Sequence, residues 1–237
     1  MTTRIEVGVA EAATHAYRDI GVPIVRATNL KKGTIQLDNL LYLDPVFVKK
    51  LESKTVFVGD LLTVRTGNAG ITAVVPEELD RCQCFTMLIS TLKKHQFARF
   101  YYYFLNIVGM VYFDITAWGT AQKNISVPIL GYCKVSIPPL QEQKEITTHL
   151  DRRTQQIDRL LEIKSKQIEL LKEQRTAIIN QAVTKGLNPE VPMKDSGIEW
   201  LGEIPEGWGV KKIKCLCNEM ISGPFGSSLK KDVYVKT

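Results

Sequence analysis

Residues 137–186 read IPPLQEQKEITTHLDRRTQQIDRLLEIKSKQIELLKEQRTAIINQAVTKG, and this stretch decides the fold. Pro138 and Pro139 can only end a strand or begin a helix, because proline has no backbone N–H to continue either ladder. From Gln141 to about Thr184 the chain contains neither Gly nor Pro and is dense in Glu, Lys, Gln, Arg and Leu, before Gly186 supplies a stop signal. We therefore predict one helix of about forty residues, about 60 Å long at roughly 1.5 Å per residue.

Apolar residues in this stretch recur in alternating steps of three and four, which is the a and d pattern of a coiled coil. The apolar positions that we expect to mediate dimerisation are Leu150, Ile157, Leu161, Ile168, Leu171 and Ile178. The seam is interrupted by three polar residues, Thr154, Lys164 and Arg175. Polar residues at such positions can fix the register and the number of helices in a coiled coil, at some cost in stability. A lone helix cannot bury such a seam, and the sequence contains no second helix of this kind. The seam therefore predicts pairing with the same helix of another copy.

Residues 1–139 alternate short β-type runs with turns and are expected to form a globular domain. The predicted strands are Val22 to Ala27, Thr55 to Val58, Leu61 to Arg65 and Ile71 to Val75. One helical patch, from Gln96 to Val111, carries Phe97, Phe100, Tyr101, Phe104, Leu105 and Val108 at helical spacing. This period favours core packing over a base-stacking surface. The predicted fold class is α+β, with one globular domain and a long helix at residues 140–187.

Residues 188–237 return to a turn-rich character. Trp200 to Trp208 has the composition of an aromatic-anchored loop, Val210 to Cys217 that of a strand, and Ser222 to Lys231 that of a flexible basic loop. About fifty residues with one strand cannot form a stable domain alone. We expect this segment to complete the fold of residues 1–139.

The composition narrows the class of partner. The 237 residues are 44% hydrophobic and carry 31 Lys and Arg against 25 Asp and Glu, which gives a net charge of +6 and favours a polyanionic partner such as nucleic acid. Five cysteines include two C-x-C pairs that do not match the C-x2-C spacing of zinc ribbons, so reduced thiols are expected. No leader sequence and no apolar run of about 18 residues is present, which predicts a cytoplasmic protein without a membrane partner.

The motifs of common enzymes are absent from the sequence. Asp44 to Phe47 resembles the D-P-P-[FY] loop with which amino-methyltransferases hold a base amine, but the second proline is missing, and a helix start or turn explains it better. No phosphate-binding loop, H-E-x-x-H or nucleophile elbow occurs, and His15, His95 and His149 show no ligand spacing. We expect no catalysis, no metal and no cofactor in this chain. A stand-alone methyltransferase built around Asp44 stays the enzymatic alternative.

Three polar loops with basic residues, each containing or directly following a glycine, suit contacts to DNA: Arg65 to Gly70, Thr120 to Asn124, and Ser222 to Lys231. Each offers backbone N–H groups, hydroxyl or amide side chains and a cation, the mixture that contacts phosphates and base edges. Each alone is equally an ordinary surface turn. The predicted DNA-binding residues are Arg65, Thr66, Asn68, Gln122, Lys123, Phe225, Ser227, Ser228, Lys230 and Lys231.

Five strings, in order along essentially the whole chain, resemble segments of the specificity subunits of type I restriction-modification systems. Gly21 to Leu30 resembles their G-V-P-x-[IV]-R-x-x-[ND]-[IL] segment, and Gly119 to Ile125 their G-[ST]-x-Q-x-x-[IL] element. Ile137 to Gln143 resembles the P-P-L-x-E-Q entry into the family's spacer helix. Glu173 to Leu187 resembles the end of that helix, and Ser196 to Pro205 the lead-in to a recognition domain.

The resemblance implies a non-catalytic subunit that reads double-stranded DNA. Family members usually carry two recognition domains and two long helices that pack antiparallel, set the spacer between half-targets and hold the methyltransferase subunits. S-adenosylmethionine, ATP and Mg would then belong to methyltransferase and restriction subunits.

This chain departs from the family pattern, because it has one nearly complete domain, one helix and the beginning of a second domain. The order resembles a circular permutation, so we expect a homodimer that mimics a full subunit and reads a bipartite palindromic target. The alternatives are a truncated, non-functional remnant and a dimerisation module without specific DNA readout.

Overall fold

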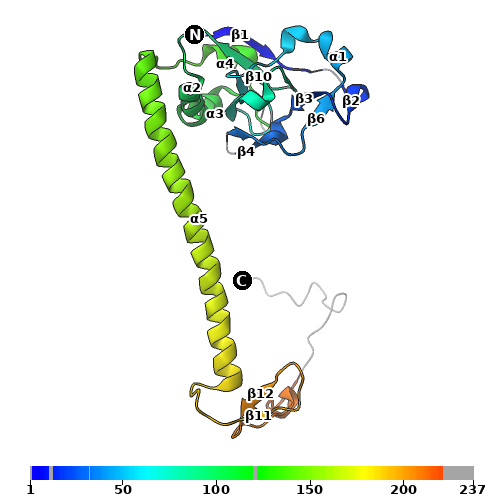
Figure 1. Ribbon diagram of the computed structural model, residues 1–237, viewed down its shortest axis with the longest axis vertical. Coiled ribbons are helices and arrows are strands. Elements are labelled where there is room, and N and C mark those ends of the chain that lie inside the picture. The colour runs from blue at the N-terminus through cyan, green and yellow to red at the C-terminus, as the bar shows by residue number, and fades with distance from the viewer. Residues whose placement is uncertain (1, 11–12, 32, 120–121, 221–237) are drawn as a thin grey trace, which may run out of the picture. The chain divides into compact units, whose positions relative to one another are not determined.

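The computed structural model describes residues 2–10, 13–31, 33–119 and 122–220 (Figure 1). They form two compact units, residues 1–157 and residues 158–237, with the long helix crossing the boundary between them. The strands of the first unit are β1 (Thr2–Val7), β2 (Tyr17–Arg18), β3 (Val22–Val25), β4 (Leu30–Lys31), β5 (Thr34–Ile35), β6 (Leu41–Leu43), β7 (Leu61–Thr63), β8 (Thr72–Val74), β9 (Gln83–Cys84) and β10 (Leu88–Leu92). Its helices are α1 (Pro45–Lys49), α2 (Ala98–Phe104), the π-helical turn η5 (Leu105–Gly109), α3 (Met110–Thr116), α4 (Val127–Tyr132) and the start of α5 (Leu140–Lys185). Short 3-10 turns are η1 (Thr14–Ala16), η2 (Ala27–Asn29), η3 (Glu52–Lys54) and η4 (Glu77–Leu79).

Two four-stranded sheets organise the first unit. The first is antiparallel, in the order β1-β10-β7-β8, with Ile5 opposite Ser90 and Leu62 opposite Ala73. The second has the order β2-β6-β3-β9, and its β3–β9 pair is parallel. With α5 beside these sheets, the fold is α+β as predicted.

The aromatic patch packs into the core, as its period predicted. Phe100, Tyr101 and Leu105 are buried in one cluster with Phe113 and residues of β7 and β10. Val108 departs from the prediction, because it is 55% exposed. The π-helical turn at residues 105–109 shifts the helical phase, so that the continuing core position is Gly109.

Three of the four strands predicted in the first unit are present, in shortened form, as β3, β7 and β8. The prediction for Thr55 to Val58 is wrong, since only an isolated bridge between Val56 and Cys82 forms there. The carboxylate of the buried Asp60 accepts the N–H of Phe57 (3.0 Å), and Asp80 accepts that of Val58 (3.0 Å). Carboxylate side chains thus bind the backbone N–H groups that a β-strand would donate to a neighbouring strand.

The predicted long helix is confirmed as α5. It begins directly after the paired prolines, and Gly186 follows its end with a φ of +78°. That left-handed conformation suits glycine and terminates the helix. Across the described part of the chain, no helix is both long and apolar enough to cross a membrane.

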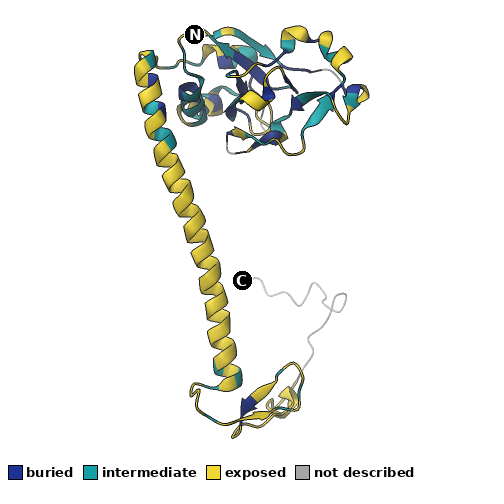
Figure 2. Ribbon diagram, viewed as in Figure 1, coloured by how far each residue is buried: buried dark blue, intermediate teal, exposed yellow. Residues whose placement is uncertain are grey.

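The first turns of α5 are fixed to the domain. Gln143 is 1% exposed, accepts the N–H of Phe97 (3.0 Å) and donates to the carbonyl of Pro138 (2.8 Å). Asp151 accepts from Arg99 Nε (3.1 Å) and Nη2 (3.0 Å) and from the Tyr103 hydroxyl (2.6 Å). Farther along, residues 152–181 are all exposed, as the yellow stretch of α5 in Figure 2 shows.

The second unit contains a hairpin of β11 (Met193–Asp195) and β12 (Glu203–Pro205), followed by the 3-10 turn η6 (Ile213–Cys215). The predicted strand Val210 to Cys217 is therefore wrong. Hydrogen bonds from Cys215 N to Lys212 O and from Leu216 N to Ile213 O close tight turns there instead. The completion of residues 1–139 by residues 188–237 stays a prediction.

Candidate nucleic-acid interface

The first predicted DNA-binding loop is the turn between β7 and β8. Val64 N donates to Ile71 O (2.8 Å), and Gly70 N donates to Val64 O (2.9 Å), which closes the turn. Gly70 has a φ of +99°, and a Cβ at this position would lie 2.8 Å from both Met110 Sδ and a carbon of the Phe113 ring. The turn therefore requires glycine at this close approach to the helix.

Asn106 holds the base of this hairpin. Its Oδ1 accepts the N–H of Thr72 (3.0 Å), and its Nδ2 donates to the carbonyls of Thr72 (2.8 Å) and Tyr102 (2.8 Å). Below it, the hydroxyls of Thr63 and Thr72 pair inside the core at 2.9 Å. With its base fixed, the turn presents Thr66 and Asn68 to solvent, while Arg65 is half-buried.

Asn124 joins the second predicted loop to the first. Its Nδ2 donates to Thr66 Oγ1 (3.0 Å), and its Oδ1 accepts from Arg65 Nε (3.4 Å). The neighbouring Ile125 N donates to Arg65 O (2.9 Å), and Asn124 exchanges backbone hydrogen bonds with Trp118 (2.9 and 3.2 Å). We call this row the Thr66–Asn124–Trp118 strip. Two loops that are far apart in the sequence thus form one surface.

The strip carries two cations with different surroundings. Among the described residues, no carboxylate forms an ion pair with Arg65. Lys123 pairs with Asp114, and both side chains are largely exposed. Gln122 is exposed, with its Nε2 3.7 Å from where a Cβ on Gly67 would lie, so the two loops also approach at their tips.

A groove beside the strip brings in a third segment with family-like sequence. It is lined by Ala27, Thr28, Leu30, Val64, Thr66, Asn68 and Ile71. Asn29, just behind it, is buried and accepts the N–H of Arg26 through Oδ1 (3.0 Å), which fixes the short turn η2. The segment Gly21 to Leu30 therefore supports the strip from one side.

Five of the ten predicted DNA-binding residues belong to this surface: Arg65, Thr66, Asn68, Gln122 and Lys123. Phe225, Ser227, Ser228, Lys230 and Lys231 lie outside the described residues. The predicted residues do not include Trp118, which is 60% exposed at the end of the strip, or Asn124, which holds the strip together. Asn124 stands inside the string Gly119 to Ile125, but nothing in its spacing to Arg65 indicated the contact.

Asp44 has a structural role, as the helix-start interpretation predicted. It caps α1 by accepting the N–H of Val46 (2.8 Å) and pairs with Arg18 Nη2 (2.9 Å). The hydrogen bond from Val46, together with the nearby Arg18 guanidinium, holds the pKa of Asp44 below its usual value. Because both oxygens are engaged, the carboxylate is not displayed toward a base amine.

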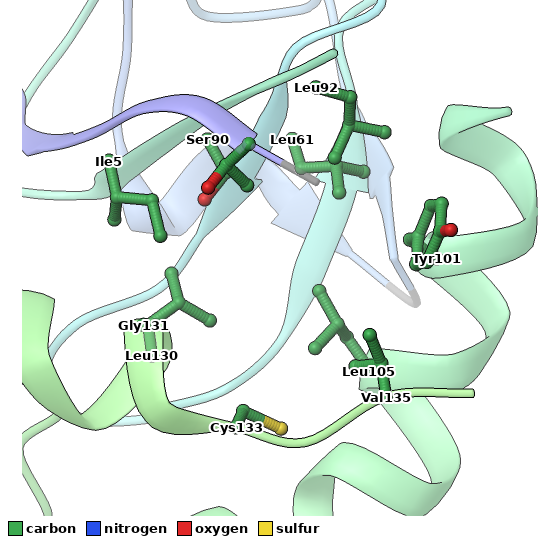
Figure 3. Close-up of a pocket in the computed structure, with 11 residues that line it drawn as sticks. Ile5, Leu61, Ser90, Leu92, Tyr101, Leu105, Leu130, Gly131, Cys133 and Val135 are labelled. Atoms are coloured by element: carbon green, nitrogen blue, oxygen red, sulfur yellow. The ribbon is translucent and has the colours of Figure 1, made fainter. Parts of the chain in front are cut away.

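A small cavity lies beside the β7–β10 pair. Figure 3 shows it between β1, β7, β10, α2 and the segment around Leu130 to Val135, with aliphatic side chains forming most of its wall. The hydroxyl of Ser90 is buried there without a hydrogen-bond partner. Burial raises the pKa of the Cys133 thiol at its rim, which makes this cysteine a poor nucleophile.

The remaining cysteines give no metal site. Burial raises the pKa of Cys82 to about 12 and that of Cys84 still further, so both are neutral thiols of the core. Cys215 and Cys217 are exposed and unbridged. Over the described ranges, no group of three or more His, Cys, Asp and Glu side chains is placed to hold an ion.

Comparison with known proteins finds type I specificity subunits among the curated relatives. Two curated relatives from Methanocaldococcus jannaschii are specificity subunits. The putative type I restriction enzyme MjaX specificity subunit is 27% identical, over 82% of this chain and 46% of its own length. The type I restriction enzyme MjaVIII specificity subunit is 35% identical, over 40% of this chain and 21% of its own length. The chain thus spans about half the length of the first relative and less of the second. A solved structure from work on assembly and conformational transition of the type I R-M system matches 77% of this chain and 44% of its own, with a TM-score of 0.62 and 19% identity, and so shares the fold.

A family model adds the decisive match. The model for the type I restriction modification DNA specificity domain matches residues 14–172, which include both loops of the strip and the first two thirds of α5. This covers well over half of the chain. The chain therefore belongs to the family of type I restriction-modification DNA specificity subunits.

Proposed function

We propose that the chain binds duplex DNA sequence-specifically as the specificity subunit of a type I restriction-modification complex. It belongs to a family of non-catalytic subunits, so methylation and cleavage of DNA are carried out by other subunits of the complex. It recruits methyltransferase and restriction subunits, to which S-adenosylmethionine, ATP and Mg belong. The globular domain of each copy of the chain reads one half of a split target.

The observation that carries this proposal is the meeting of two loops on the Thr66–Asn124–Trp118 strip. A guanidinium, an ammonium group, hydroxyls and amides lie on one surface of a basic chain. Cations position a protein on phosphates, whereas amide and hydroxyl groups read base edges. Asn106 and Gly70 hold the hairpin rigidly, so the readers are positioned before DNA arrives.

The second part of the proposal is a homodimer formed through α5. Ile157, Leu161, Ile168, Leu171 and Ile178 are each between 52% and 63% exposed. So many aliphatic side chains in one heptad seam favour a helical partner. A two-fold pair of identical domains reads two inverted half-sites, that is, a bipartite palindrome.

Recruitment of the methyltransferase subunit is supported by a second exposed row on α5. Leu160, Ile163 and Leu170 are each between 53% and 58% exposed and lie beside the first seam. One partner helix covers an a/d seam but not a flanking row as well. We assign this row to the methyltransferase subunit.

The test is selection of bound duplexes from a randomised library by the purified chain, with and without the methyltransferase subunit. We expect enrichment of a split, inverted repeat. Changing Gln122 and Ser228 together to Ala should abolish the enrichment while partner binding is kept.

Arg65→Ala should weaken all binding and reduce the dependence of log K on log salt by about 0.9, since one phosphate contact is lost. Lys49→Ala removes the same charge from α1, takes no part in the strip, and serves as the matched control. Binding that stays sequence-blind with the methyltransferase subunit present would favour a dimerisation module or a remnant.

A further inference from the structure

The groove beside the strip has an apolar floor and a polar rim. Leu30 and Val64, which are 7% and 2% exposed, form the floor. Thr28, Thr66 and Asn68 line the groove as exposed residues and form the rim. None of the seven residues that line it carries a charge. The groove therefore suits an uncharged, apolar group that has a hydrogen-bonding atom beside it.

The size of the groove limits what it can accept. Its volume is about 210 Å³. Sites for small molecules and cofactors usually measure about 300–1,000 Å³. The groove therefore suits one projecting group of a larger partner better than a whole cofactor.

Both walls of the groove are held by backbone hydrogen bonds. On the η2 side, Asn29 N donates to Arg26 O (2.9 Å), and Asn29 O accepts the N–H of Gln36 (2.8 Å). On the side of the β7–β8 turn, Val64 N donates to Ile71 O (2.8 Å). The groove is thus formed before a partner arrives, and binding there carries little cost of ordering the chain.

The groove is continuous with the proposed DNA interface. Thr66 lines the groove and also bridges to Asn124 in the strip, so a partner that lies on the strip covers the groove as well. Arg65, the residue before Thr66, supplies a cation for the phosphates of such a partner. Among the groups that base pairs display in the major groove of DNA, the apolar one is the C5-methyl group of thymine.

Thr66 provides the hydrogen-bonding group beside the apolar floor. Its Oγ1 accepts from Asn124 Nδ2 (3.0 Å), which leaves its own O–H free to donate. Thymine carries an acceptor, O4, on the ring atom next to the one that carries the methyl group. A methyl group placed in the groove therefore brings O4 to the rim, where Thr66 lies.

We infer that the groove reads the C5-methyl group of a thymine in the major groove, with Thr66 donating to O4 of the same base. The apolar contacts to the methyl group come from Ala27, Leu30, Val64 and Ile71. This inference rests on the proposed function and names the base that this part of the surface reads.

Replacement of thymine by deoxyuridine tests the inference, because it removes the methyl group and keeps O4 and the base pairing. The target is the duplex selected from the randomised library by the full chain with the methyltransferase subunit. Such a library contains no 5-methylcytosine, so thymine is its only source of this methyl group. Each thymine of the target is replaced in turn. One position in each half-site should lose about fourfold in affinity, which corresponds to one buried methyl group, while the other positions change little.

A variant that fills the groove tests the location. Ala27 lines the groove and is half-buried, so Ala27→Leu places a larger side chain there. Thymine and deoxyuridine at the sensitive position should then bind equally well. Ala177→Leu makes the same change on an exposed part of α5 and should keep the fourfold ratio. Thermal unfolding of both variants verifies that they are folded.

The outcomes separate this inference from the proposal beneath it. A library from which no sequence is enriched would overturn the proposed function and the thymine site with it. An enriched target in which no thymine responds to deoxyuridine would keep the proposed function and overturn the thymine site. A response that persists in Ala27→Leu would place the reading of the methyl group elsewhere and overturn its assignment to this groove.

Discussion

Asn124→Ala separates the positioning of the proposed DNA-reading groups from their charge. The change removes the hydrogen bonds of Asn124 with Thr66 Oγ1 (3.0 Å) and with Arg65 Nε (3.4 Å). The backbone bonds of residues 124 and 125 to Trp118 and Arg65 remain. Because both lost bonds are partly solvent-exposed and one is long, the free energy of unfolding should fall by only about 1 kcal/mol.

The effect on DNA binding follows from the freed side chains. Arg65 must be ordered again on binding, which costs about 0.5–1.5 kcal/mol and raises the dissociation constant about two- to tenfold. No charge is lost, so the slope of log K against log salt should stay as in the unchanged chain. Arg65→Ala, by contrast, should make that slope less steep.

Fluorescence anisotropy with a labelled target duplex at four or more salt concentrations measures both quantities, and thermal unfolding measures stability. A reduced salt slope in Asn124→Ala would refute the reasoning, because it would mean that a phosphate contact depends on the asparagine itself. Unchanged affinity at every salt concentration would also refute it, since the strip would then play no part in ordering Arg65.

Three further predictions concern the rest of the chain. Ser90→Ala removes a buried hydroxyl without a partner, so the free energy of unfolding should rise by about 1 kcal/mol in denaturant titration; a destabilised variant would contradict this. Because the pKa of Asp44 is lowered, the stabilisation from its cap on α1 is fully present above the unfolded pKa of about 3.9. This stabilisation is lost as the pH falls through the lower pKa of the folded state, so Asp44→Ala should flatten the acid limb of a pH–stability curve. Leu161→Asp with Ile168→Asp places charges in a dry seam and should yield a monomer in light scattering, whereas Lys166→Asp on the opposite face should leave the dimer intact.

The long helix could be predicted almost to its ends because its signals are local. The prolines before Leu140 and the glycine after Lys185 act within one helical turn, and the heptad period needs no knowledge of the fold. The strand predicted at Thr55 to Val58 failed for the opposite reason. Its N–H groups go to Asp60 and Asp80, and the sequence alone does not say which donors a carboxylate will take.

The candidate site was predictable in composition but not in assembly. Glycine, amide and cationic residues marked each loop separately as a surface turn suited to DNA. Their meeting depends on Asn124, whose contacts to Arg65 and Thr66 join residues more than fifty positions apart. Nothing in the sequence groups Trp118 with these loops, because only its bridge to Asn124 places it on the strip.

The seam shows the same division between local and distant causes. Its period is visible in the sequence, but its usable length depends on where the domain covers it. Gln143 and Thr147 are polar, so the sequence pattern gives no reason to count them in an apolar seam. In the fold they are among the most buried residues of α5, because Gln143 bonds to Phe97 and Pro138. That burial moves the start of the exposed part of the seam to Thr154.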